Sequence, residues 1–325
     1  MAIVVTILVV ALLAYAGLFL YTKIKDITNS EPRTSASELP YDIFVFDSEL
    51  SIKPQDTKVE RGSEDTGFKT NRTFGVIDGV GAWFMTNKID AGIFARSLAK
   101  QIEKQVRTFK RKEVKPNALT RAVEKALARV TEKGSCTAVI VDISPSTGLL
   151  TAFSIGDATM LVLRPGKEKN FLTPENIVLQ TESKSHSFNK PYTIGTTREY
   201  TSSSGEKKVS KADGPYDANT YTAKVQKGDI ILLFSDGVSD NLYLENGQDQ
   251  LPDHHGILEI VSEGLRAESN ASQIATNITS RAYAASIDSY WYSPYRKNAK
   301  EENEQLFSLV GGKKDDITTL CIVVK

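Results

Sequence analysis

The chain has 325 residues, of which 40% are hydrophobic and 25% are charged, and its formal net charge is zero. This is the composition of a globular protein with enough apolar material for a large core. The charge balance excludes the global positive field that attracts nucleic acid or acidic membranes, and two cysteines are too few for a disulfide framework or a zinc finger. We therefore expect no nucleic-acid partner, and we expect Cys136 and Cys321 to be buried core residues in a reducing compartment.

The first segment, residues 2–21, reads AIVVTILVVALLAYAGLFLY and contains no charged side chain. About 20 apolar residues are enough for a helix to cross a bilayer. Tyr21, Lys23 and Lys25 are residues expected at a membrane boundary. The sequence therefore predicts a transmembrane anchor over residues 1–22 that contacts the lipid bilayer. The rest of the chain should lie on the side that bears the two lysines.

A cleaved signal peptide is the alternative for this segment, and Ala14, Tyr15 and Ala16 supply a small-residue pattern for it. The run lacks a basic leading region and continues past that site, which favours an uncleaved anchor. Residues 23–40 are polar and contain two prolines, so they are predicted to be a linker. We expect residues 41–325 to form one domain, because nothing in them repeats and no second boundary is evident.

Eight apolar segments enriched in β-branched residues predict strands. They are residues 41–46, 74–78, 136–143, 149–155, 159–163, 222–225, 229–234 and 318–324. Because several of these runs are continuously apolar, the sheets should be covered on both faces.

Four amphipathic segments predict helices, at residues 91–109, 117–132, 256–265 and 270–287. Asp90 stands at the N-cap position of the first. The helices form an early and a late pair with strands between them, so the predicted fold class is α+β, with helices covering packed antiparallel sheets. The polar segment 201–220 is predicted to be a mobile surface loop.

Acidic residues follow or precede apolar strands at five places in the chain. They are Glu64 and Asp65, Asp78, Asp157, Asp236, and Asp315 and Asp316. A single aspartate beside glycine usually makes a turn, but strand ends can converge in space. Clustered carboxylates repel one another and are costly to bury. A pair of divalent cations would remove this conflict, and oxygen ligands suit Mg²⁺ or Mn²⁺.

Taken in order, the motifs SED, VIDGVG, GSCTAVIV, IGDATMLVLR, LLFSDGVSDNL and KKDDITTLCIVV resemble those of the metal-dependent type 2C (PPM-type) protein serine/threonine phosphatases. The resemblance covers most of residues 41–325. The segments SHSFNKPYTIG and YWYSPY are similar to the branch known as mitochondrial protein phosphatases. The resemblance implies a four-layer αββα sandwich of two antiparallel sheets flanked by helices. It also implies phosphoprotein substrates.

The same resemblance implies a role for each acidic residue. Asp78 would bridge two metal ions, the carbonyl of Gly79 would bind the second ion, and Asp236 and Asp315 would complete the first site. Asp78 and Asp236 are thereby implied to be central to catalysis as well.

The remaining acids have implied roles at the margins of the two sites. Glu64 would bind at the second site, directly or through water, and Asp157 with Asp236 would offer a weaker third site. Asp65 and Asp316 would be outer residues or weak ligands.

Two positions concern the phosphate and the leaving group. Arg61 is a candidate for bidentate phosphate binding, but its offset from the acidic motif departs by one from the common family pattern, and a surface arginine is the alternative. Val80 stands where many family members have a histidine thought to protonate the leaving alkoxide. His186, His254 and His255 could replace it, although each is more commonly an ordinary surface residue.

The sequence thus predicts a membrane-anchored protein serine/threonine phosphatase that uses Mg²⁺ or Mn²⁺ and a metal-activated water. The alternative is a weak or inactive pseudophosphatase that acts as a tethered binding or regulatory module. Val80 and the shifted position of Arg61 favour the alternative slightly, whereas Asp78, Asp236 and Asp315 favour the enzyme. The family branch suggests mitochondria, and the charge-free N-terminal run suggests the endoplasmic reticulum or nuclear envelope. The sequence does not identify the substrate or the oligomeric state.

Overall fold

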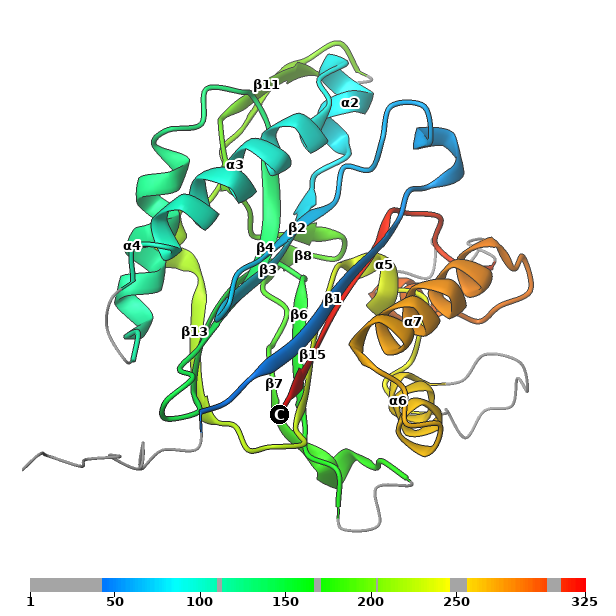
Figure 1. The fold of residues 1–325 in the computed structure, drawn as a ribbon. Coiled ribbons are helices and arrows are strands. Elements are labelled where there is room, and N and C mark those ends of the chain that lie inside the picture. The colour runs from blue at the N-terminus through cyan, green and yellow to red at the C-terminus, as the bar shows by residue number, and fades with distance from the viewer. Residues whose placement is uncertain (1–42, 110–112, 167–170, 203, 246–255, 303–310) are drawn as a thin grey trace, which may run out of the picture. The chain divides into compact units, whose positions relative to one another are not determined.

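Two antiparallel sheets lie face to face, and each carries helices on its outer side (Figure 1). The computed structural model describes residues 43–109, 113–166, 171–202, 204–245, 256–302 and 311–325. The predicted anchor at residues 1–22, the linker at residues 23–40, and both His254 and His255 lie outside these residues. Within the described part of the chain, no helix has the length and apolar character needed to cross a membrane.

The first sheet has five strands. Its order is β1 (Phe46–Lys53), β15 (Ile317–Val324), β14 (Ile230–Phe234), β6 (Thr159–Leu163) and β7 (Ile177–Gln180). All neighbouring strands in it are antiparallel. Strands β14 and β15 are buried along almost their whole length, which explains their continuously apolar sequences.

The second sheet has six strands. Its order is β13 (Asn219–Lys224), β5 (Leu149–Ile155), β4 (Ser135–Ile143), β3 (Thr73–Gly79) and β2 (Thr66–Lys69), and β10 (Ile194–Gly195) also pairs with β4. Two short hairpins lie outside the sheets. They are β8 (Ser185–Ser187) with β9 (Lys190–Pro191), and β11 (Arg198–Thr201) with β12 (Lys207–Ser210).

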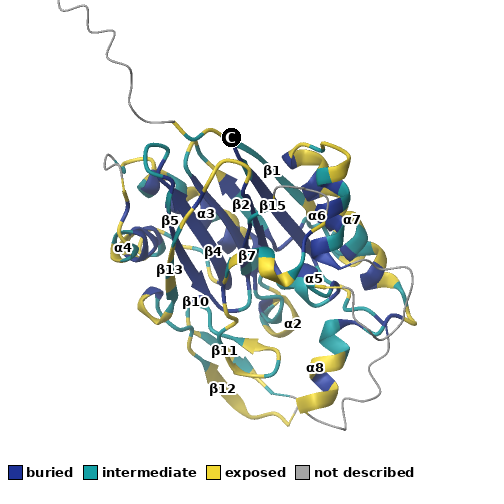
Figure 2. Cartoon of the chain, turned by 90° about the horizontal axis from the view of Figure 1, so that it is seen from below, coloured by how far each residue is buried: buried dark blue, intermediate teal, exposed yellow. Residues whose placement is uncertain are grey.

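The core follows from the alternation of side chains along each strand. In β3, Phe74 and Val76 pack between the sheets, and Ile77 packs on the helix side. Helices α3 (Ala91–Val106) and α4 (Pro116–Leu127) cover the second sheet. Helices α6 (Ile257–Arg266) and α7 (Ala271–Ile287) cover the first sheet. The α+β class and the αββα layers are therefore confirmed, and Figure 2 shows the buried strands between helices with exposed outer faces.

Local sequence explains where the main helices begin. The Asp90 side chain accepts a hydrogen bond of 2.8 Å from Gly92 N, which confirms the predicted cap of α3. At α7, Asn270 and Gln273 form a reciprocal capping box. Three shorter helices complete the described set, namely α2 (Ala82–Asn87), α5 (Asp236–Ser239) and α8 (Pro294–Glu302).

Two sequence predictions were wrong in detail. The first strand is not residues 41–46 but Phe46–Lys53, because the segment that pairs with β15 is less apolar than the run before it. The segment 201–220 is not one structureless loop. It contains β12, which pairs with β11, and a 3₁₀ turn at Pro215–Asp217. The hairpin could not be recognised from its exposed polar residues, because its strands pair through backbone hydrogen bonds and bury few side chains.

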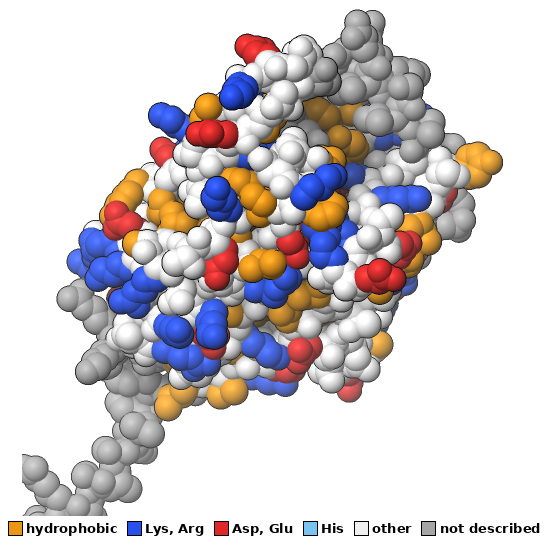
Figure 3. All heavy atoms as spheres, turned by 90° about the horizontal axis from the view of Figure 1, so that it is seen from above, with side chains coloured by type: hydrophobic (Ala, Val, Ile, Leu, Met, Phe, Trp, Pro, Cys, Tyr) orange, Lys and Arg blue, Asp and Glu red, His pale blue; other side chains and the backbone are white. Residues whose placement is uncertain are grey.

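Both cysteines are buried and unpaired, as predicted. Residues 43–325 form one compact unit. Its surface carries interspersed acidic and basic side chains on the face in Figure 3, as expected for a chain without net charge.

Candidate metal centre

A cleft of about 710 Å³ opens where strand ends from both sheets meet. Its lining includes seven of the residues for which the sequence suggested a metal-binding or phosphate-binding role: Arg61, Glu64, Asp78, Gly79, Asp157, Asp236 and Asp315. Asp65 and Asp316 are buried beside them. The predicted convergence of separate acidic turns on one place is therefore what the fold produces.

The two sheets deliver the acids in the same way, at the ends of strands. Asp78 and Gly79 are the last residues of β3, and Asp157 lies in the turn between β5 and β6. Asp236 begins α5 two residues after β14 ends, and Asp315 lies two residues before β15. Because β3 belongs to one sheet and β14 and β15 to the other, the cleft brings together charges that neither sheet could assemble alone.

Gly79 allows the loop that carries Glu64 to approach β3. The Gly79 N–H donates a 3.2 Å hydrogen bond to Glu64 O. A Cβ at position 79 would lie 2.8 Å from that same oxygen, which is too close for any other residue. The absence of a side chain thus keeps the carbonyl edge of position 79 beside the acidic turn.

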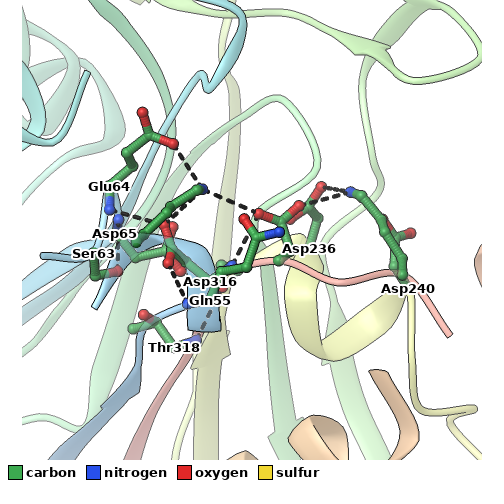
Figure 4. Close-up of polar contacts among 12 residues, drawn as sticks. Gln55, Ser63, Glu64, Asp65, Asp236, Asp240, Asp316 and Thr318 are labelled. Carbon is green, nitrogen blue, oxygen red and sulfur yellow. Dashed lines mark hydrogen bonds and ion pairs between the residues drawn. The ribbon is translucent and has the colours of Figure 1, made fainter. Parts of the chain in front are cut away.

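Asp316 ties this turn to the last strand. Its Oδ1 accepts a 2.8 Å hydrogen bond from Gln55 N, and its Oδ2 accepts bonds of 2.8 Å from Glu64 N and 3.0 Å from Lys58 Nζ. Figure 4 shows Asp316 between Glu64 and Gln55. Asp316 is 2% exposed, so it fixes the segment that holds Arg61 and Glu64. This geometry supports an outer role for it.

Two lysines pair with the acidic side chains of the cleft. Lys58 Nζ lies 2.7 Å from Glu64 Oε2 and 3.7 Å from Asp315 Oδ1. Lys313 Nζ lies 2.5 Å from Asp236 Oδ2, 2.6 Å from Asp240 Oδ2 and 3.2 Å from Asp315 Oδ2. Burial disfavours the charged form of Lys313, but these carboxylates raise its pKa overall.

The middle of the cluster has no such partner. None of the ion pairs between described residues involves Asp65, Asp78 or Asp157. Burial, and then the neighbouring carboxylates Asp65 and Asp236, raise the pKa of Asp78 well above its ordinary value. Burial and neighbouring acids likewise raise the pKa of Asp65 to about 7 and that of Asp157 to about 8. One buried oxygen of each of these two side chains has no hydrogen-bond partner.

The flanking acids behave differently because of the lysines. Burial alone would raise the pKa of Asp236, but the Lys313 ammonium lowers it overall. Burial raises the pKa of Asp240 to about 7 in spite of Lys313. The uncompensated charge is therefore concentrated around Asp78.

The donor set fits divalent cations in number and kind. We define the acidic cluster as Glu64, Asp65, Asp78, Asp157, Asp236, Asp240, Asp315 and Asp316. The cations that pair with it among the described residues are Lys58, Arg61 and Lys313. Eight carboxylates thus face three positive charges, and two divalent ions would offset four of the remaining five.

As placed, no three acidic, histidine or cysteine side chains of the described chain enclose one common point at ligating distance. The contacts explain this arrangement, since ammonium groups take up oxygens of Glu64, Asp236 and Asp315. Ions at the centre of the cluster would therefore have to displace some of these ammonium contacts.

Arg61 lies at the edge of the cleft and not in open solvent. Its guanidinium group lies 3.9 Å from the centre of the Phe84 ring. Its Nη1 is 3.0 Å from Glu64 Oε1 and 3.7 Å from Asp90 Oδ1. The guanidinium therefore has a fixed orientation beside the acids, which the surface-arginine alternative did not predict.

Val80 lines the cleft with an apolar side chain, and its N–H donates to Ser135 O at 2.9 Å. His186 is not part of the cleft lining. Its ring stacks on Tyr192 at 4.0 Å and contacts Asp213 at 3.0 Å. These contacts make it a surface histidine of the β8–β9 hairpin and not a substitute proton donor.

Three residues of the site, Asp240, Lys58 and Lys313, were not predicted from the sequence. Asp240 could have been found, because it follows Asp236 by four residues and so shares a helical face with it. The lysines gave no such indication, since nothing in a sequence distinguishes a buried ammonium from a solvated one.

Comparison with known proteins places these features in context. A family model described as stage II sporulation protein E (SpoIIE) matches residues 83–288. The chain is 30% identical over 270 residues to "Probable protein phosphatase 2C 80" of Arabidopsis thaliana, which covers 82% of this chain and 56% of that protein. It is 29% identical over 277 residues to "Protein phosphatase PTC7 homolog fig" of Drosophila grimshawi, with 82% and 81% covered.

Among solved structures, the photosystem II phosphatase PBCP matches with a TM-score of 0.65 at 26% identity, over 86% of this chain and 99% of that chain. The chain spans about half the length of the first curated relatives that it matches.

Proposed function

Since the chain belongs to the family of PP2C (PPM-type) phosphatases, we propose that it is a Mg²⁺- or Mn²⁺-dependent protein phosphatase that hydrolyses phosphoserine and phosphothreonine. One observation carries the proposal. Asp78, Asp157, Asp236 and Asp315 come from four separate strand ends and line one cleft, where positive charge is lacking around Asp78.

The acidic cluster would hold two ions. Asp78 would contact both, Asp236 and Asp315 would complete one site, and the Gly79 carbonyl and Glu64 would complete the other. A weaker third ion, if the chain bound one, would need Asp157 together with Asp236. When bound, such ions supply Lewis acidity and lower the pKa of water toward neutrality. The chain itself supplies the fixed carboxylates and a cleft wide enough for a phosphorylated side chain.

Arg61 would bind the phosphate of the substrate. Its planar group is already oriented by Phe84 and Glu64, and arginine can contact two phosphate oxygens at once. Val80 offers no proton, and no histidine lines the cleft in the described part of the chain. We therefore infer that a water molecule held in the cleft supplies the proton for the leaving alkoxide, or that turnover is slower than in relatives with a histidine.

A pseudophosphatase is the second candidate, and Val80 is the observation that favours it. Such a module would bind phosphoproteins without turnover. Against it stand the acids around Asp78, because their uncompensated charge costs stability and a binding module would gain nothing from it.

Membrane attachment is a further part of the proposal. The charge-free run at residues 2–21 would anchor the protein in a mitochondrial, endoplasmic reticulum or nuclear envelope membrane. The phosphatase domain would lie on the side that bears Lys23 and Lys25. A fluorescent fusion with and without residues 2–21 tests this part independently of activity.

The test of the activity is hydrolysis of a phosphoserine peptide by the full chain with Mn²⁺ or Mg²⁺, with and without a chelator. We expect metal-dependent release of phosphate, which Asp78→Asn abolishes. Asp213→Asn is the matched control, because Asp213 is an acid that pairs with His186 outside the cleft. Folded protein that binds the peptide but releases no phosphate at any metal concentration would establish the pseudophosphatase instead.

A further inference from the structure

Lys313 is a closely held cation of the cleft. Its ammonium contacts Asp236, Asp240 and Asp315 at 2.5, 2.6 and 3.2 Å, and its side chain is only 16% exposed. A solvent-exposed lysine would form at most a screened ion pair that contributes little to stability. Three contacts with half-buried carboxylates instead indicate a charge that the fold holds in one place.

The backbone of Lys313 is fixed as firmly as its side chain. The Lys313 N–H donates to Asn241 Oδ1 at 2.8 Å, and the Lys313 carbonyl accepts from Asn241 Nδ2 at 2.8 Å. Asn241 Nδ2 also donates to Gly237 O at 2.9 Å, so Asn241 is tied to α5. The short segment that carries Asp236 and Asp240 therefore also determines where Lys313 lies.

An aromatic ring also lies near the Lys313 ammonium. The Lys313 ammonium lies 5.2 Å from the centre of the Tyr295 ring, and Tyr295 N donates to Asp240 O at 3.1 Å. The contacts of Lys313 thus come from α5, from the start of α8 and from the segment before β15. Such an arrangement needs no ion to hold it together.

The position of Lys313 bears on how many ions the acidic cluster can hold. Both ions of the proposed function would use Asp78, which has no cationic partner among the described ion pairs, although one of them would also use Asp236 and Asp315. A third ion would need Asp236 together with Asp157 or Asp240, and Lys313 already contacts Asp236 Oδ2 and Asp240 Oδ2. An ammonium and a divalent ion cannot both occupy that space, since like charges repel strongly at such distances.

We propose that Lys313 is a built-in replacement for a third metal ion: its ammonium neutralises Asp236 and Asp240 and keeps a third divalent ion from binding beside them. This inference rests on the proposed two-ion function. It deepens that function by fixing the ion count at two. With Lys313 present, two divalent ions leave the cluster of eight acids one charge short of neutral, and a third ion would overshoot. Without Lys313, a third ion would bring the cluster to neutrality.

The test counts the ions bound per chain. Equilibrium dialysis of the full chain against Mn²⁺, followed by metal analysis, should give two ions for the wild type and three for Lys313→Gln. Lys314→Gln is the matched control, because it removes one positive charge from the same cleft lining without a contact to Asp236 or Asp240. It should bind two ions. The double variant Lys313→Gln/Asp240→Asn should return to two.

The outcomes separate the two proposals. A folded wild type that binds no Mn²⁺ refutes the proposed function, and this inference with it. Two ions in both the wild type and Lys313→Gln refute the inference alone, even if their affinity rises, because Lys313 would then only compete with the two main ions. Three ions in the wild type also refute it, whatever the variants do. Lys313→Met preserves the length of the side chain and serves if Lys313→Gln does not fold.

Discussion

Replacing Asp78 by asparagine should make the metal-free protein more stable while removing its response to metal. Asp78 lies at the end of β3, and burial together with Asp65, Asp236 and other acids raises its pKa well above 3.8. Asparagine has nearly the same shape and no charge. It therefore relieves the repulsion without creating a cavity.

The structure bounds the size of this effect. One unit of pKa corresponds to about 1.36 kcal/mol, and about three units separate the ordinary value from pH 7. Holding this carboxyl uncharged at pH 7 thus costs the folded state at most about 4 kcal/mol. Because the new amide must find its own partners, we expect a gain of about 1–3 kcal/mol, or roughly 2–4 °C in Tm for each kcal/mol in a domain of this size.

Mn²⁺ should reverse the order of stability of the wild type and Asp78→Asn. A ligand at a hundredfold excess over its Kd stabilises the folded state by about 2.7 kcal/mol. The wild type should gain that much with Mn²⁺, and Asp78→Asn should gain far less. Thermal melts with a chelator and with Mn²⁺, and Asp213→Asn as control, measure both quantities. A variant that is less stable than the wild type in chelator, or that gains equally from Mn²⁺, would refute the assignment of Asp78 as the shared ligand.

Three further predictions concern the frame of the site. Asp316→Ala should lower the free energy of unfolding in urea by about 3–5 kcal/mol, because two backbone N–H groups and a lysine lose their buried acceptor; a loss below 1 kcal/mol would contradict this. Gly237→Ala should be severely destabilising, since its Cβ would lie 2.0 Å from Asp316 O, whereas Gly166→Ala has open space and should be nearly neutral in the same melt. The metal-free protein should lose stability as the pH rises from about 4 to 8, because Asp65 and Asp157 bind protons more tightly in the folded state (pKa about 7 and about 8) than in the unfolded chain. Saturating Mn²⁺ should flatten that slope in urea titrations, and a rise of stability over this range without metal would contradict the charge assignment.

The central strands could be predicted from the sequence because a strand that is buried on both faces requires a continuous run of apolar residues. β5 and β6 begin and end at the predicted residues, 149–155 and 159–163. The exposed hairpin of β11 and β12 was missed for the opposite reason, since its residues are mostly polar. Helix α2 was missed because it has only six residues and begins three positions after the strand that ends at Gly79. A hydrophobic pattern can be recognised only over a sufficient length of sequence. Short helices and strands depend instead on tertiary contacts.

The acids of the cleft were predictable because the same step, from strand to carboxylate, recurs along the chain. What each acid does was less predictable. Asp315 and Asp316 are neighbours in sequence, yet one lines the cleft and the other holds Gln55 and Glu64 in place from more than 250 residues away in the chain. No local pattern distinguishes the two, because the difference lies in which way each side chain points.

The distribution of positive charge indicates where ions would bind. Lys58 compensates Glu64 and Asp316, and Lys313 compensates Asp236 and Asp240. A fold that needed only internal neutrality could have placed a third cationic side chain at Asp78. It leaves that position without one and surrounds it with a cleft open to solvent. An external cation is the partner that such an arrangement accepts. The two lysines therefore limit the place for ions to the centre of the acidic cluster.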